Sequence, residues 1–533
     1  MTGRTASLAR ASGSMAVATL VSRVTGLASK LLLAAVIGLS VVNDSYTIAN
    51  TLPNIVFELL LGGVLTSIVV PVLVRAQRDD ADGGEAYTQR LLTVAAVVLG
   101  LATVVAVLAA PLLTRLYLDD SGGGANLDLA TAFGYLLLPE ILFYGLGALF
   151  AAILNTRGVF GPPAWAPVLN NLVVMVTLGV YWLMPGELSL NPVRMGDAKL
   201  LVLGIGTTLG IVVQAAVLVP ALRRSGFVFR WRFGWDPRLS AFGGLALWVV
   251  GYVVVSQVGY VVTTRVASDA GAGSIAAYSY AWLLLQVPYG VLGVSLLTAI
   301  MPRMSRAAAA GDIAGVVSDL SLGSRLSALM LVPISAVLTV LGGAAGVALF
   351  SLGEADVSDA SRLGRTLAVS AFGLLPFAVV MLQLRVFYAM HDARTPTLIN
   401  VAMVAVKVPL LLACPLVLSP ERVVLGLAFV NGVSFVVGAI VGEVWLRTRL
   451  GRLDTARVLL TVGKTVVAGV AAAGAALAVD LVLPDGMGDT TRAWLVLVVG
   501  AVLGLVVAFG VLALMRVQEM RSVTARFGRR GAR

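Results

Sequence analysis

The sequence predicts an all-α integral membrane protein with fourteen transmembrane helices. Of its 533 residues, 59% are hydrophobic and only 12% are charged, whereas a soluble domain carries about 25% charged residues. The apolar residues form long segments between Met15 and Met515. Most of these segments reach the roughly 20 residues that cross a hydrocarbon core of about 30 Å. Because the loops between them are mostly short, we expect one integral membrane unit without a separate soluble domain.

The expected spans follow one another along the chain, and glycine and proline within them are tolerated because neighbouring helices satisfy the backbone. The first span contains charges and is interpreted as an uncleaved helix rather than a signal peptide. The fourteen ranges are 15–39, 46–74, 91–116, 128–154, 164–184, 199–222, 239–264, 274–301, 320–351, 365–390, 397–418, 423–446, 458–484 and 494–515.

The net charge of +11 is distributed in a way that indicates a membrane orientation. Arginines gather in the N-terminal tail, in the loops at 75–90, 223–238, 303–306 and 447–457, and after Arg516, while the alternate loops are acidic or neutral. This positive-inside pattern predicts a multi-pass membrane protein with both termini in the cytoplasm. Basic segments are attracted to anionic lipid there, so nucleic acid is not expected as a partner.

Cysteine and histidine are too scarce for several kinds of site. The single cysteine, Cys414, excludes an intrachain disulfide and a thiolate metal cluster. The single histidine, His391, lies in a short turn between spans, where a zinc site or a Ser-His-Asp triad is not expected. We therefore predict no catalytic residue, no metal site and no cofactor.

An internal repeat relates the two halves of the chain with an offset of a little over 230 residues, or six spans. Six spans preserve helix orientation, so the sequence predicts two six-helix lobes related by a parallel repeat, an arrangement that places a substrate path between rocking lobes. The expected parts are an N-lobe at 1–222, a C-lobe at 223–450, two extra helices at 451–516 and a basic cytoplasmic tail at 517–533. The matching segments are 21–24 with 255–258, 65–76 with 297–307, and 132–139 with 371–376.

Charged and amide side chains inside the spans are the candidates for function, because an ionisable group at bilayer depth is costly unless it lines a polar path. Arg23 and Lys30 are seven residues apart, about two helical turns, and so share nearly one face. Cations inside a bundle suit an anionic headgroup such as a phosphate or diphosphate. The alternative is that Arg23 pairs structurally with a carboxylate, or that Lys30 extends to the interface. The complete candidate set for the substrate cavity is Arg23, Lys30, Asp44, Asn54, Glu58, Glu140, Arg265 and Arg385.

Several motifs give the chain a resemblance, over nearly its whole length, to the MviN/MurJ lipid II flippases of the multidrug/oligosaccharidyl-lipid/polysaccharide exporter superfamily. The most specific is the run from Phe387 to Pro396. The resemblance implies transport of a polyprenyl-diphosphate-linked glycopeptide to the outer leaflet by alternating access, with membrane lipids and cell-wall synthesis proteins as further partners and no covalent chemistry. The other matching motifs lie at 22–26, 43–46, 52–54, 70–73, 153–155 and 288–294.

The chain departs from this family at several charged positions. Many members have a further arginine in the first span and paired arginines after Leu-Pro-Asn, where this chain has Ser29 and the pair Phe57-Glu58. Among the charged positions only Arg23 and Asp44 match. Either Lys30, Arg265 and Arg385 bind the phosphates in place of the family's arginines, or the substrate differs, or the chain is a divergent paralogue. The composition, rich in Ala, Val, Gly and Arg, indicates an actinobacterial member.

Other functions remain open at this stage. They are an exporter of another lipid-linked polysaccharide, a drug exporter of the same superfamily, a membrane glycosyltransferase, and a divergent paralogue that does not transport. The external loops are short for a glycosyltransferase, and drug exporters usually have twelve spans and an acidic cavity. Sodium, protons or the membrane potential are the possible driving forces, and Asp44, Glu58 and Glu140 are the titratable candidates for coupling.

Overall fold

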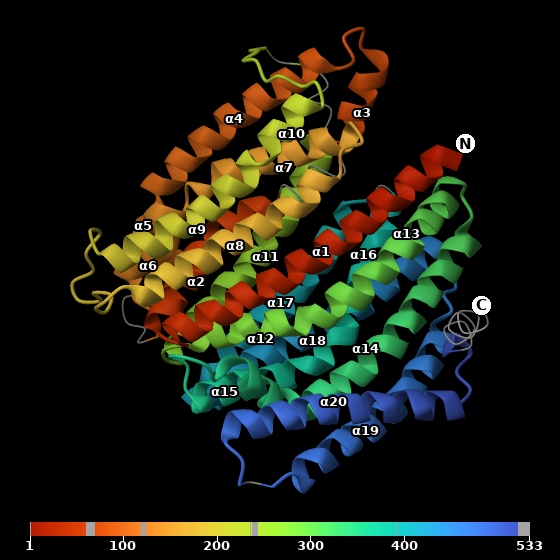
Figure 1. The fold of residues 1–533 in the computed structure, drawn as a ribbon. Helices are drawn as coiled ribbons and strands as arrows, with labels where there is room; N and C mark the ends of the chain where they lie inside the picture. The colour runs from red at the N-terminus through yellow and green to blue at the C-terminus, as the bar shows by residue number, and fades with distance from the viewer. Residues whose placement is uncertain are drawn as a thin grey trace. The chain divides into compact units, whose positions relative to one another are not determined.

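The computed structural model describes residues 2–59, 70–118, 124–234, 236, 243–390, 392–484 and 486–520, and in these ranges every regular element is a helix (Figure 1). The all-α fold class is confirmed. The chain forms two compact units, residues 1–253 and 254–533, and the boundary falls inside one long helix, α11.

The first unit contains ten helices in its described residues, before α11 begins. They are α1 (Thr2–Ile37), α2 (Val41–Leu59), α3 (Val70–Asp79), α4 (Glu85–Leu108), α5 (Ala110–Tyr117), α6 (Leu127–Leu137), α7 (Glu140–Thr156), α8 (Gly161–Leu183), α9 (Ala198–Ala216) and α10 (Leu218–Arg224).

The second unit is built around α14, which contacts α13, α15, α16, α19 and α20. Its helices are α11 (Gly243–Asp269, begun in the first unit), α12 (Ser274–Pro288), the π-helical turn η3 (Tyr289–Gly293), α13 (Val294–Ala309), α14 (Ile313–Phe350), α15 (Val357–Ser370), the 3-10 turn η4 (Ala371–Gly373), α16 (Leu374–Ala389), α17 (Arg394–Val417), α18 (Pro420–Leu450), α19 (Thr455–Val482) and α20 (Asp489–Leu514).

Twelve helices of the described ranges are long and apolar enough to cross a membrane, and the number is 13 when the bent pair α6–α7 counts as one span. These correspond to expected spans 1 and 3 to 14. The second expected span, 46–74, includes residues 60–69, which lie outside the described residues. The total of fourteen therefore stays a prediction.

Two spans are interrupted within the repeated motif of the sequence. Between α6 and α7 the axis bends by 41°, at Leu138 and Pro139, because a proline cannot donate the backbone hydrogen bond that would continue the helix. In the corresponding span of the second unit, the 3-10 turn at Ala371–Gly373 separates α15 from α16. The bend places Glu140 in the first turn of α7, in the interior of the unit.

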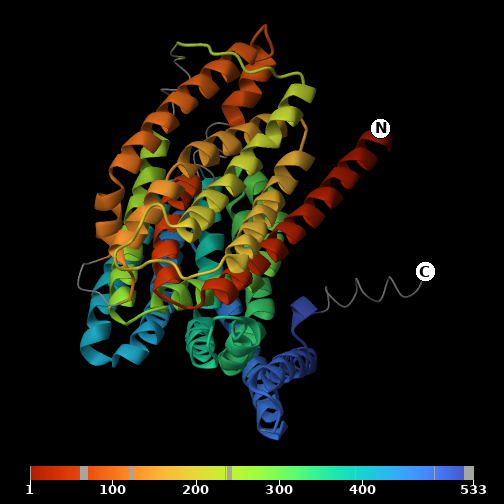
Figure 2. The ribbon, with the colours of Figure 1, turned by 60° about the vertical axis from the view of Figure 1, so that its left-hand side comes forward.

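The two C-terminal helices α19 and α20 pack against each other and against α14, as Figures 1 and 2 show. Small residues allow this close approach, since a side chain at Gly504 would lie 2.9 Å from Val337 and 3.1 Å from the carbonyl oxygen of Ala472. At 38 residues, α14 is about 57 Å long and exceeds the hydrocarbon core.

A buried ion pair fastens the segment after α20 to α14. The Arg325 guanidinium donates to the Glu519 carboxylate and, through Nε, to the carbonyl oxygen of Ser321 at 3.3 Å. Arg325 and Glu519 are only 8% and 7% exposed. Leu512 and Val517 pack beside the pair against Leu329.

Replacing Glu519 by leucine is expected to destabilise the protein by about 3–5 kcal/mol, because the Arg325 charge is then left buried without a partner. The double replacement R325M/E519L removes both charges and is expected to restore most of the loss. Thermal unfolding of the detergent-solubilised protein measures both changes. An unchanged transition temperature in E519L would mean that the ion pair does not hold this segment.

Candidate functional site

The two cations of the first span lie on α1. Arg23 is exposed and Lys30 is partly buried, and in the described part of the chain no hydrogen bond or ion pair engages the Arg23 side chain. Asn171 of α8 fixes α1 by donating to the carbonyl oxygen of Ser22 and to Oγ1 of Thr25, each at 3.0 Å. Helix α1 therefore presents an unpaired guanidinium from a well-anchored backbone.

Glu140 is fully buried, with no exposed surface. Its Oε1 accepts a hydrogen bond from Oγ1 of Thr208 at 3.3 Å, while Oε2 has no hydrogen-bond partner among the described residues. An uncompensated buried carboxylate costs several kcal/mol. Lys30 is the cation that interacts electrostatically with the Glu140 carboxylate, without a direct ion pair between the two side chains.

Hydroxyl and amide groups surround this charge pair. The hydroxyl of Tyr46 hydrogen-bonds that of Thr207 at 3.0 Å, and the hydroxyl of Tyr144 donates to Oδ1 of Asn54 at 3.1 Å. Both tyrosines lie close enough to Glu140 to interact with its charge. The structure thus brings Lys30, Asn54 and Glu140 together in one polar cluster inside the first unit.

Sequence reasoning missed the hydroxyl members of this cluster, which are Tyr46, Tyr144, Thr207 and Thr208. Hydroxyl groups in a span are common and usually bond to the backbone of their own helix, as Thr207 also does to the carbonyl oxygen of Leu203 at 2.7 Å. The only available signal was two consecutive threonines among glycines in an otherwise apolar span, at residues 204–210.

The other predicted carboxylates are Asp44, which lies outside the cluster, and Glu58. Asp44 is fully buried in the first turn of α2, ten residues before Asn54, which is about 15 Å along a helix. Its neighbour Ser45 accepts a hydrogen bond from the backbone N–H of Asn126 at 3.0 Å, so this end of α2 is tied to the start of α6. The side chain of Glu58 lies outside the described residues.

The remaining predicted cations belong to the second unit. Arg265 is partly buried on α11, and Arg385 is exposed on α16, where it interacts electrostatically with Tyr289 of η3 and with Tyr388. Arg385 resembles Arg23 in being a guanidinium without a carboxylate partner among the described residues.

A polar contact set in the second unit joins α17 to its neighbours. The Lys407 ammonium donates to Oδ1 of Asn431 on α18 at 2.9 Å, and Asn400 donates to Oγ of Ser256 on α11 at 2.8 Å. These hydrogen bonds between neighbouring helices satisfy polar side chains within the membrane. The bond from Lys407 gives its ammonium a structural role at the contact between α17 and α18.

The motif from Phe387 to Pro396 forms the turn between α16 and α17. Oδ1 and Oδ2 of Asp392 accept from the backbone N–H of Thr395 at 3.0 Å and from its hydroxyl at 2.6 Å, and Arg449 lies 3.3 Å away. Burial alone would raise the pKa of Asp392, but these hydrogen bonds and the arginine lower it below its usual value. The motif therefore holds together a turn and is not part of the polar cluster.

Chemically, the described residues of the cluster offer one cation, Lys30, and several hydrogen-bond donors to an anion, and they include no nucleophile paired with a base. The described residues contain no group of three or more His, Cys, Asp or Glu side chains that could hold a metal ion. The arrangement fits binding and release of a charged group within the bilayer.

Comparisons with known proteins agree on one family. The family model described as lipid II flippase MurJ matches residues 33–498. The probable lipid II flippase MurJ of Vibrio cholerae serotype O1 is 30% identical over 391 residues, which cover 71% of this chain and 72% of the relative. The lipid II flippase MurJ of Burkholderia cenocepacia is 29% identical over 399 residues, with 73% and 74% covered.

Two solved structures show the same fold. A lipid II flippase MurJ in an inward closed conformation superposes with a TM-score of 0.74 at 18% identity, covering 94% of this chain and 98% of the other. An inward-facing multidrug resistance MATE transporter of the MOP superfamily gives a TM-score of 0.62 at 14% identity, covering 80% and 94%. With the family model matching most of the sequence, this chain belongs to the lipid II flippase MurJ family.

Proposed function

We propose that this protein moves a polyprenyl-diphosphate-linked peptidoglycan precursor, lipid II, from the cytoplasmic to the outer leaflet of the bacterial cytoplasmic membrane by alternating access. It is a transporter and performs no covalent step. The observation that carries the proposal is the pair of cations on α1, with Arg23 exposed and unpaired in the described part of the chain. Such a charge within a span needs an anionic ligand, and the family's named substrate carries one.

Arg23 and Lys30 have different roles in this proposal. The Arg23 guanidinium presents a planar fork that binds phosphate oxygens in pairs, whereas the Lys30 ammonium is a point charge. Lys30 is shared between the diphosphate and Glu140. When the headgroup leaves, Glu140 remains as the counter-charge of Lys30. This lowers the free-energy cost of the step in which the empty protein opens again to the cytoplasm.

The orientation belongs to the same proposal. The basic loops and tails are placed in the cytoplasm by the positive-inside pattern of the sequence, so the loop between α8 and α9 faces outward. The driving force is proposed to be sodium, protons or the membrane potential. Glu140, with one carboxylate oxygen unpartnered among the described residues, is the group through which a cation or proton would couple.

The test is depletion of the protein in its host, followed by measurement of lipid II exposure at the outer leaflet. Wild type is expected to restore exposure, and Arg23→Ala is expected to fail at equal membrane abundance, because it removes the bidentate phosphate contact. The matched control is Arg224→Ala, which removes an exposed arginine at the cytoplasmic end of α10 and is expected to rescue fully.

The other outcomes assign different functions. Full rescue by Arg23→Ala would contradict the role of this residue in the cavity. Normal lipid II exposure after depletion would instead show that the chain exports another lipid-linked polysaccharide, or that it is a divergent paralogue that does not transport.

A further inference from the structure

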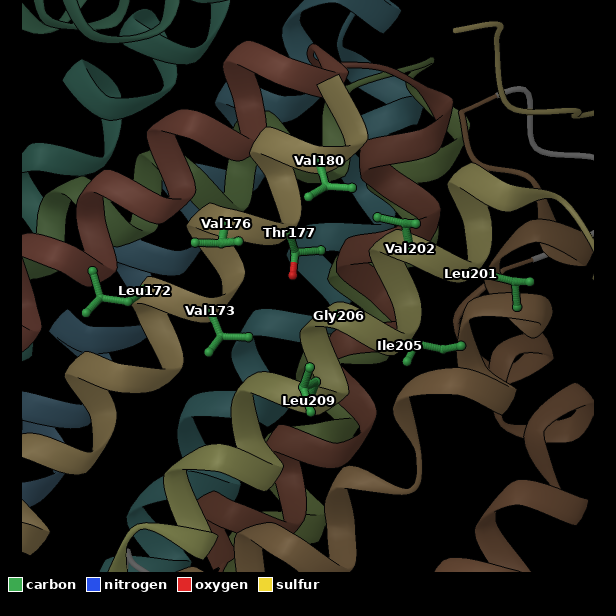
Figure 3. A pocket seen from close by; sticks show the side chains of 10 residues that line it. All are labelled: Leu172, Val173, Val176, Thr177, Val180, Leu201, Val202, Ile205, Gly206 and Leu209. Carbon is green, nitrogen blue, oxygen red and sulfur yellow. The ribbon is translucent and has the colours of Figure 1, made fainter. Parts of the chain in front are cut away.

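A lipid-sized groove runs along the outside of the hairpin formed by α8 and α9, away from the polar cluster. Its volume is about 560 Å³, and Figure 3 shows apolar side chains from both helices along it. The rims are exposed, with Val176 on α8 at 67% and Ile205 on α9 at 53%. Between them the floor is formed by Gly206, which has no side chain, and by Thr177, which is 7% exposed.

The missing side chain at position 206 creates this floor. A Cβ atom added to Gly206 would overlap the side chain of Thr177, so α8 and α9 pack closely at this point. The larger apolar side chains on either side form the walls of the groove. The lining residues on α8 run from Leu172 to Val180, a separation of eight residue steps or about 12 Å along the helix. Exposed apolar side chains of this kind within a span face hydrocarbon.

A second hollow, also of about 560 Å³, lies in the loop that joins the same two helices. Its charged lining residues are Glu187, Arg194, Asp197 and Lys199. Asp197 is already engaged, because Oδ1 accepts from the backbone N–H of Lys199 at 2.9 Å and Oδ2 accepts from that of Ser189 at 3.2 Å. The Lys199 ammonium lies 4.8 Å from the centre of the Tyr181 ring. Arg194 and Glu187 are exposed and make no side-chain bond within the described ranges.

The two hollows are neighbours along α9 and at the end of α8. On α9, Val202 lines the apolar groove and Ala198, four residues earlier, lines the polar hollow. Residues four apart lie on the same face of a helix, about 6 Å along its axis. On α8, Val180 lines the groove, and Met184, which directly follows the last residue of the helix, lines the polar hollow. The apolar groove therefore ends beside the charged loop.

We propose that this hairpin binds one phospholipid whose headgroup carries both a phosphate and a primary ammonium, with an acyl chain in the groove. The two available cations, Arg194 and Lys199, fit the phosphate, and the Glu187 carboxylate fits the ammonium. With Asp197 included, the lining has two positive and two negative side chains, which complements a zwitterion. A diphosphate would need an excess of positive charge, so this is a site for a bilayer lipid and is separate from the site of the proposed transport substrate. In the proposed orientation it faces the outer leaflet.

The proposal is tested by native mass spectrometry of the full-length protein mixed with equal amounts of phosphatidylethanolamine, phosphatidylcholine and phosphatidylglycerol. Wild type is expected to retain one phosphatidylethanolamine in preference to the other two. The double variant R194A/K199A is expected to lose about tenfold or more of that affinity, because two charge-assisted contacts are removed. Ile205→Trp, which fills the groove, is expected to lose it as well.

Two controls separate this site from general lipid contact. Leu459→Trp places the same bulky ring on α19, at a residue that is 63% exposed and outside the groove, and is expected to bind as wild type does. Thermal unfolding confirms that each variant is folded. Equal retention of all three lipids, or retention unaffected by R194A/K199A and Ile205→Trp, would overturn the site. A preference for phosphatidylglycerol would overturn the assignment of a zwitterionic headgroup.

Discussion

Replacing Gly364 by valine is expected to abolish folding of the protein. Gly364 on α15 packs against Gly342 and Gly346 on α14, and here the two helix backbones touch. A Cβ atom at Gly342 would lie 2.6 Å from the carbonyl oxygen of Gly364, and one at Gly364 would overlap the carbonyl oxygen of Gly342. Because the opposing atoms belong to the backbone, no rotamer change relieves the overlap, and the helices must separate.

The expected cost exceeds the roughly 1–3 kcal/mol of an ordinary overpacked core, and each 1.4 kcal/mol lowers the ratio of folded to unfolded protein about tenfold. Fluorescence-detected size-exclusion chromatography in detergent measures the yield of folded protein. The matched control is Gly343→Val on α14, next to Gly342. A Cβ atom added at Gly343 has no neighbouring atom within 4 Å. A normal yield for Gly364→Val would show that α14 and α15 do not need this contact.

The helical architecture was predictable because the bilayer leaves few alternatives. A segment in hydrocarbon must satisfy its own backbone hydrogen bonds, so the long apolar runs predicted helices such as α14 and α20 without knowledge of their neighbours. The position of Pro139 was visible in the sequence, but the 41° bend it causes depends on how α6 and α7 pack. A proline in a span is compatible with a straight helix or a break.

The candidate site was only partly predictable, for a similar physical reason. The cost of charge at bilayer depth marks Lys30 and Glu140 separately, but they are 110 residues apart, and their interaction requires α1 and α7 to meet. The hydroxyls of Tyr46 and Thr207 have no such cost, so nothing in the sequence distinguishes them from other hydroxyls. Arg325 and Glu519 lie near the ends of spans, where charges are ordinary, and only the packing of the segment after α20 shows that they are buried.

Lys30→Met is expected to abolish transport and also to lower the stability of the protein, because the cation that interacts electrostatically with the buried Glu140 carboxylate is lost. Glu140→Gln keeps the shape of the side chain and the contact with Thr208, but it removes the counter-charge of Lys30. We expect this variant to bind the anionic headgroup more tightly and to release it more slowly. Thermal unfolding and rescue of lipid II exposure measure the two effects separately.

The double variant K30M/E140L distinguishes a structural ion pair from a transport site. Removing both charges leaves no uncompensated group, so most of the lost stability is expected to return. Transport is not expected to return, since Arg23 is then the one cation of α1 left to bind the diphosphate. Recovery of both stability and lipid II exposure in the double variant would show that Lys30 and Glu140 serve only the fold. Recovery of stability without recovery of transport would show that an apolar pair supports the fold equally well at this position. The Lys30 ammonium would then be required for the substrate and not for the fold.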